Sequence, residues 1–184
     1  MLSPDLERRK VDLIREIFAA FDGVSRVGGK SWTDATAEDL YWTPEQQRES
    51  GLVDTDNCWQ DLVDDDSWRD APGVGGFVFL DAIGFRYYIA PAMIRDVRRG
   101  YSEVLDFTLS CPPVHGKGRE SSLQQWSLLS DAQRRCIAAF VRFAIDRAFA
   151  NDAGYELDNY QKAWDNYWKS VTEATPGSAH ASDQ

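Results

Sequence analysis

The sequence predicts a mainly α-helical, compact single domain, on the basis of helical spacing, helix-start signals and a shortage of strand patterns. Apolar residues recur at intervals of three and four over four stretches, as in helices with one buried face: 6–21, 85–93, 137–148 and 157–171. One strand-like run, at residues 104–109, has no obvious hairpin partner. The expected fold is therefore a multi-helix domain that allows one small β element.

Helix-start signals divide the N-terminal third of the chain. Pro4 follows Ser3, which is the arrangement of a capped helix with proline in its first turn. Either Ser31 or Thr33 caps a short second helix, and Thr43-Pro44 begins a third. We expect one long helix and two short ones in this region.

The most apolar and aromatic part of the chain is the stretch 77–93. Its first four residues form a continuous apolar run, which is either a buried strand or the lead-in to a buried helix. Asp81 has the side chain of a helix cap, and helical spacing begins at Phe85. Pro91 lies inside that pattern, so we expect the helix to kink or restart there.

Arg86 is the single basic residue of this apolar stretch. We interpret it as a structural residue with a buried stem and a carboxylate partner from elsewhere in the chain, because such arginines are more common than catalytic ones. Its neighbours Tyr87 and Tyr88, together with Pro91, are also assigned structural roles. No catalytic residue is assigned anywhere in the chain.

The C-terminal half predicts two further helices. Ser130 and Gln133 have the spacing of a capping box, and the helix that follows buries an aliphatic and aromatic face. A last helix carries a Trp and Tyr stripe. We place a single helical domain at residues 1–171 and a disordered tail at 172–184, where the composition is small and polar.

The segment Phe79–Ile89 resembles an uncharacterised bacterial family of unknown function, DUF6714-like, whose core reads F-L-x-x-x-(A/G)-F-R-Y/F-Y-L-P-A. The likeness extends to Ser130–Gln133 and covers about residues 18–149. The chain departs from the core pattern at Ala90, which stands before Pro91. The resemblance implies a soluble bacterial domain and supplies no catalytic residues.

Charge and cysteine content restrict the class of partner and the compartment. The formal net charge is −10 and the pI about 4.6, which argues against binding to nucleic acid or to an anionic membrane but permits a basic protein partner. The three Cys residues show no paired spacing. The N-terminus lacks the apolar core of a signal peptide, and no apolar run reaches membrane-spanning length. We therefore expect a cytoplasmic protein.

Residues 54–66 are the acidic extreme of the chain, with six Asp and no Lys or Arg. We expect a loop-rich segment, held to the domain by Cys58-Trp59 and Leu62-Val63, whose charges repel one another unless a cation meets them. The predicted partner-binding residues are its carboxylates and the two nearby indoles: Asp54, Asp56, Trp59, Asp61, Asp64, Asp65, Asp66 and Trp68.

Motifs for metals and cofactors are incomplete. The run that begins at Asp54 resembles a calcium loop, but Trp59 stands at the sixth place and Asp65 at the twelfth, where such loops have Gly and Glu. Cys111 and His115 provide two ligands, which are too few for a zinc site. No metal and no cofactor is predicted.

These observations favour a non-enzymatic, acidic protein-binding domain. One form of it is an immunity-type protein that neutralises a basic bacterial toxin, such as a nuclease, by charge complementarity and a few aromatic anchors. Two alternatives stay open. One is a carboxylate-dependent hydrolase with a site near Arg86 and residues 54–66, and the other is a regulatory interaction module.

Overall fold

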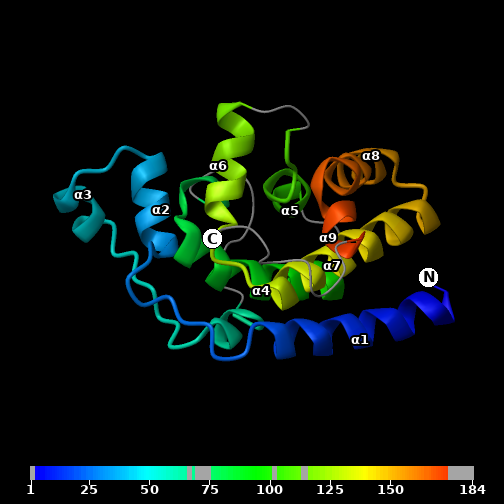
Figure 1. Ribbon diagram of the computed structural model, residues 1–184. Coiled ribbons are helices and arrows are strands. Elements are labelled where there is room, and N and C mark those ends of the chain that lie inside the picture. Colours follow the sequence, from blue (N-terminus) through cyan, green and yellow to red (C-terminus); the bar gives the residue numbers. More distant parts are fainter. Residues whose placement is uncertain (1–2, 66–67, 69–75, 101–102, 113–115, 174–184) are drawn as a thin grey trace, which may run out of the picture.

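The computed structural model describes residues 3–65, 68, 76–100, 103–112 and 116–173, and these ranges contain helices and no strand (Figure 1). The prediction of a compact, mainly α-helical domain is confirmed. The last helix ends at residue 173, two residues beyond the predicted boundary, and 174–184 of the predicted tail lie outside the described residues. The elements are α1 (Pro4–Ala20), α2 (Trp32–Asp39), α3 (Pro44–Glu49), η1 (Trp59–Leu62), η2 (Phe77–Phe79), α4 (Ala82–Arg99), α5 (Glu103–Thr108), α6 (Lys117–Gln125), α7 (Asp131–Ala150), α8 (Gly154–Ala163), η3 (Trp164–Trp168) and α9 (Lys169–Glu173).

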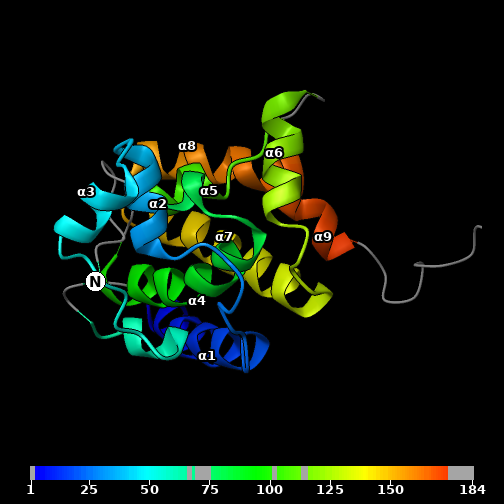
Figure 2. The same cartoon turned by 90° about the vertical axis from the view of Figure 1, so that its left-hand side faces the viewer.

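The helices form three layers around α4 and α7. Helix α1 packs against both of these helices from one side, and α8 packs on α7 from the other. Figures 1 and 2 show α1 along one edge of the molecule, with α5, α6 and α8 on the opposite side of the central layer. Helices α2 and α3 lie at one end, beside the first half of α4. No helix within the described ranges has the length and hydropathy needed to cross a membrane.

The predicted helix caps are confirmed. The hydroxyl of Ser3 accepts the amide of Leu6 at 3.2 Å, and capping boxes form at Thr43 and Ser130. Of the two candidates for the second helix, Ser31 is the cap, because its hydroxyl accepts the amide of Asp34 at 3.1 Å.

Helix α4 is the core helix, and 13 of its 18 residues are buried. Asp81 caps it as predicted and accepts the amide of Gly84 at 2.8 Å. The apolar run before it forms the 3-10 turn η2, so it is a lead-in to a helix and not a strand. The expected restart at Pro91 does not occur, and α4 runs unbroken to Arg99. Pro91 is buried, so the packing of the whole apolar stretch holds the helix on both sides of the missing amide.

The strand-like run 104–109 is helical, which corrects the prediction of a β element at this place. It forms α5 and the turn after it, and the amide of Leu109 bonds the carbonyl of Leu105 at 2.9 Å. Both of these leucines are buried, whereas Phe107 between them is 71% exposed. A strand would place all three side chains on one face, while helical spacing of four separates Phe107 from the leucines.

Gly84 allows the loop before α2 to approach α4. The amide of Lys30 donates to Asp81 at 3.2 Å, and a Cβ atom on Gly84 would lie 2.5 Å from the carbonyl oxygen of Lys30. Within a helix, Gly→Ala normally stabilises by about 1 kcal/mol. Here the close backbone contact reverses the sign.

We therefore expect Gly84→Ala to lower the free energy of unfolding by about 1–3 kcal/mol, which urea denaturation would measure. Gly154→Ala is the control, since nothing lies within 4 Å of the added methyl group in α8. That variant should be as stable as the parent or slightly more stable. Stabilisation by both substitutions would show that the contact between loop and helix is not tight.

Candidate partner-binding cleft

A cleft of about 490 Å³ opens between α2, α4 and the irregular segment 51–56. Its floor is a cluster of three buried rings, since the centroid of Trp32 lies 5.2 Å from both Trp68 and Tyr88. The backbone amide of Trp32 donates to the hydroxyl of Tyr88 at 3.0 Å, which fixes α2 to α4. The half-buried Trp42 completes the aromatic lining. The floor is therefore preformed by packed side chains.

Three carboxylates line the cleft, and they belong to Asp54, Asp56 and Asp65. Asp54 and Asp56 lie in a segment without regular secondary structure, and both side chains reach the cleft. Asp54 accepts the amide of Thr33 at 3.2 Å, which joins the segment to the first turn of α2. No Lys, Arg or His is found among the lining residues that the structure describes.

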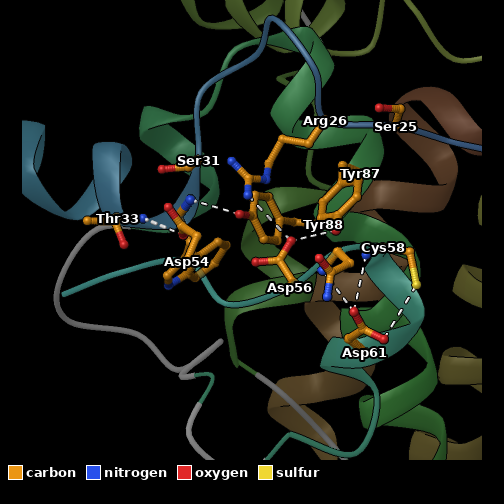
Figure 3. A network of polar contacts seen from close by, with 12 residues as sticks. Ser25, Arg26, Ser31, Thr33, Asp54, Asp56, Cys58, Asp61, Tyr87 and Tyr88 are labelled. Atoms are coloured by element: carbon orange, nitrogen blue, oxygen red, sulfur yellow. Dashed lines mark hydrogen bonds and ion pairs between the residues drawn. The ribbon is translucent and has the colours of Figure 1, made fainter.

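Asp56 is the deepest of these carboxylates, with a side chain only 3% exposed. Its Oδ2 accepts the hydroxyl of Tyr87 at 2.5 Å and lies 3.5 Å from Nη2 of Arg26 (Figure 3). The guanidinium of Arg26 also lies over the rings of Tyr87 and Tyr88, 5.6 and 5.9 Å from their centroids. Arg26 thus supports Asp56 from behind, and it does not itself line the cleft.

Burial and neighbouring charges shift the pKa values of Tyr87, Tyr88 and Arg26. Burial raises the pKa of the Tyr87 phenol, and the hydrogen bond to Asp56 raises it further. Burial is also the main cause that raises the pKa of Tyr88. For Arg26, burial acts to lower the pKa, but Tyr88 and the carboxylates of Asp56 and Asp54 raise it overall. Both phenols therefore stay protonated at neutral pH, while Arg26 stays charged.

The other carboxylates of the acidic segment have local structural partners. Asp61 accepts the amides of Asn57 at 2.8 Å and Cys58 at 3.2 Å, and these bonds lower the pKa of its carboxyl group. Asp64 pairs with Arg98 at 2.8 Å. The segment itself contains no Lys or Arg, but the fold brings Arg26 and Arg98 to two of its carboxylates from outside the segment. Asp66 lies outside the described residues.

The two tryptophans of the predicted partner-binding set are buried, which corrects their assignment as surface contacts. Trp59 is fully buried, and its indole N–H donates to the carbonyl of Phe21 at 2.9 Å. Trp68 belongs to the cleft floor, with the guanidinium of Arg95 5.2 Å from its ring centroid. Trp59, Leu62 and Val63 attach the segment to the domain as expected, whereas Cys58 is exposed.

Arg86 is half-buried, and among the described residues it has no carboxylate partner, contrary to the prediction. Its Nη1 donates to the carbonyl of Leu128 at 3.4 Å. Two residues along a helix correspond to a turn of about 200°, so Arg86 and Tyr88 project to nearly opposite sides of α4. The structure therefore does not bring Arg86 together with the carboxylates of the cleft.

A small effect is expected for Arg86→Ala because its hydrogen bond is long and partly exposed. We expect the free energy of unfolding to fall by about 1 kcal/mol, measured by urea denaturation. A loss of 3 kcal/mol or more would restore the interpretation of Arg86 as one half of a buried ion pair.

The buried arginine of this protein is Arg147, which the sequence reasoning missed. Its Nη1 donates a hydrogen bond to Oδ1 of Asp96 at 2.6 Å, and its Nε donates one to Oε1 of Glu156 at 3.0 Å. The sequence could have indicated this burial, because the spacing of Phe140, Ala144 and Arg147 places them on one face of a helix. A charge on an apolar face indicates a buried partner.

The cleft is bordered by three exposed apolar side chains, those of Leu40, Leu52 and Val53. The exposed Tyr41 follows Leu40 in the chain and does not itself line the cleft. Tyr41 is 92% exposed and has a positive φ of 54°, which non-glycine residues seldom adopt. The cleft is therefore an acidic hollow with an apolar border.

Comparison with known proteins identifies the family. The model of the family of unknown function DUF6714 matches residues 9–172, a longer range than the 18–149 expected from the resemblance. Searches of curated proteins and of solved structures found no match. Since the match covers most of the sequence, the chain belongs to the DUF6714 family of unknown function.

Proposed function

We propose that this protein is a non-enzymatic binding domain whose acidic cleft docks a protein with a basic surface. The observation that carries the proposal is the lining of the cleft, which combines three Asp side chains with aromatic rings and has no basic residue among the described residues. Charge complementarity of this kind accelerates association and selects the partner.

The surroundings of the cleft strengthen its negative field. Residues 30–65 contain ten Asp or Glu and two Lys or Arg. Lys30 is paired with Glu38, and Arg48 bonds the carbonyl of Pro44 in its own helix. Arg26 and Arg98 offset Asp56 and Asp64 from outside this range, and the net negative charge of residues 30–65 still favours the approach of a positively charged surface.

The exposed apolar rim supplies the other half of a typical interface. Stable interfaces combine a partly apolar contact area with polar complementarity, and aromatic residues often dominate their energy. Leu40, Leu52 and Val53 provide such an area next to the carboxylates. A partner that neutralises the carboxylates would cover this rim as it docks.

A nucleic-acid-degrading toxin has the required chemistry. Such an enzyme needs a positive surface to bind phosphates, and an acidic protein docked there would block it. An immunity-type role is therefore the specific form of binding that we propose. A regulatory partner with a basic surface would use the same contacts.

The test is affinity capture from extracts of the cells that make the protein, at low and at high salt. The parent should retain a basic protein at low salt, and the double variant Asp54→Asn, Asp65→Asn should lose it. Asp5→Asn with Asp12→Asn is the matched control, since both carboxylates are exposed on α1 and pair only with neighbours on that helix. Equal retention by all three proteins, or capture of acidic proteins alone, would contradict the proposal.

A further inference from the structure

We infer that the cleft receives one arginine side chain of the basic partner, with Asp54 and Asp56 binding the guanidinium between aromatic walls. The inference rests on the proposed function and specifies its chemistry. It is carried by the unfilled acceptor capacity of the two carboxylates and by the way this protein already holds its own arginines.

The two carboxylates each have one oxygen without a hydrogen bond from the described residues. Asp54 uses Oδ1 for the amide of Thr33, and Asp56 uses Oδ2 for the hydroxyl of Tyr87. Figure 3 shows both carboxylates beside the ring of Tyr88. For Asp56 the open acceptor belongs to a side chain that is 97% removed from solvent, since its exposed fraction is 3%. Because both residues line the cleft, a donor that enters it could bond these remaining oxygens.

The walls of the cleft match a planar cation. Guanidinium groups stack on aromatic faces and donate two parallel hydrogen bonds to carboxylates, whereas an ammonium is a hydrated point charge. Trp32, Trp42 and Trp68 supply aromatic surface to the cleft, whereas the ring of Tyr88 is fully buried beneath them. The volume of about 490 Å³ accommodates a side chain of this length.

The protein itself shows the arrangement on the inner side of these rings. Arg26 lies over Tyr87 and Tyr88 while it faces Asp56, and Arg95 lies over Trp68. Neither guanidinium lines the cleft. A partner's guanidinium would make the same kinds of contact, with the carboxylates and the partly exposed aromatic rings that line the cleft.

The experiment titrates the protein with three small probes and follows the tryptophan indole N–H resonances by NMR. The probes are N-acetyl-arginine amide, the corresponding lysine amide and the neutral, isosteric citrulline amide. We expect the arginine probe to cause saturable shifts of the Trp32 and Trp42 signals, with a Kd in the millimolar range because the probe is small. The lysine probe should bind more weakly, and the citrulline probe at least about tenfold more weakly, because it lacks the charge.

Variants locate the binding in the cleft. Asp54→Asn keeps the hydrogen bond from the amide of Thr33 but removes the charge, so it should lower the affinity for the arginine probe about tenfold. Asp56→Asn should do the same if it folds, and Asp54→Asn decides the matter if it does not. Asp5→Asn should change nothing. Equal shifts by the arginine and citrulline probes, or unchanged binding to Asp54→Asn, would overturn the inference.

Failure of the inference and failure of the proposed function give different results. If a captured basic protein binds normally after each of its surface arginines is replaced by lysine, the cleft does not select arginine, although the binding function stands. If the arginine probe binds but no basic protein is captured, both the proposed function and the assignment of the arginine to a protein partner are wrong.

Discussion

Replacement of Arg147 by Ala is expected to lower the free energy of unfolding by about 3–5 kcal/mol. Arg147 is buried in α7 and bonds the carboxylates of Asp96 and Glu156, which are buried as well. Burial acts to lower the pKa of Arg147, but these two carboxylates raise it overall, so the guanidinium is charged in the folded state. The variant deprives two buried negative charges of this cation, and urea denaturation would record the loss.

Arg142→Ala is the control for that measurement. Arg142 lies on the same helix and pairs with Asp146 at 3.3 Å, but its side chain is 52% exposed. Exposed pairs of this type contribute about 0.3–0.5 kcal/mol. If the two variants lost the same small amount of stability, the buried cluster would not be a major support of the fold.

Replacement of Trp59 by Ala is the second substitution with a large expected effect, a loss of about 3–5 kcal/mol in the free energy of unfolding. The indole is fully buried, its N–H bonds the carbonyl of Phe21, and its ring lies 5.2 Å from that of Phe18. The truncation leaves a cavity between η1 and α1, and the carbonyl of Phe21 keeps only its hydrogen bond from the amide of Val24. Thermal or urea unfolding would measure the loss.

Trp42→Ala is the matched comparison, because Trp42 is half-buried at the entrance of the cleft. It should retain most of the parent's stability and weaken binding of the basic partner. The opposite pattern would be a Trp59→Ala variant that is stable but does not bind, and a Trp42→Ala variant that binds normally. That result would show that Trp59 contacts the partner and that the cleft does not.

Local signals in the sequence predicted the helices well, because caps and periodicity act over three or four residues. Ser3, Thr43 and Ser130 each bond the amide that their spacing indicates. The same reasoning failed at residues 104–109, where a six-residue run that alternates apolar and polar residues after Val104 was taken for a strand, although so short a run can also form a helix. Only packing decides, and it buries Leu105 and Leu109 but not Phe107.

The sequence predicted only one wall of the candidate site, the acidic segment. The sequence singled out the acidic segment, and three of its carboxylates, those of Asp54, Asp56 and Asp65, do line the cleft. The opposite wall comes from α2, and the supporting Arg26 lies 30 residues before Asp56, so no local pattern connects them. Composition also could not distinguish a buried Trp59 from an exposed one.

The roles of Arg86 and Arg147 show the same limit. Both stand in apolar helical stretches, and each was a reasonable candidate for a buried ion pair. The outcome depends on which carboxylates the neighbouring helices present. Helix α4 supplies Asp96 and α8 supplies Glu156 to Arg147, while Arg86 meets the carbonyl of Leu128.

The most direct test of the central claim is the rate of association between this protein and its captured basic partner, measured by stopped flow at low and high salt. The parent should associate rapidly at low salt and slow steeply as salt rises. The variant Asp54→Asn, Asp65→Asn should associate several-fold more slowly at low salt and show a flatter salt dependence, with the two rates converging at high salt. Equal rates and equal salt slopes for parent and variant would contradict the assignment of the acidic cleft as the docking site.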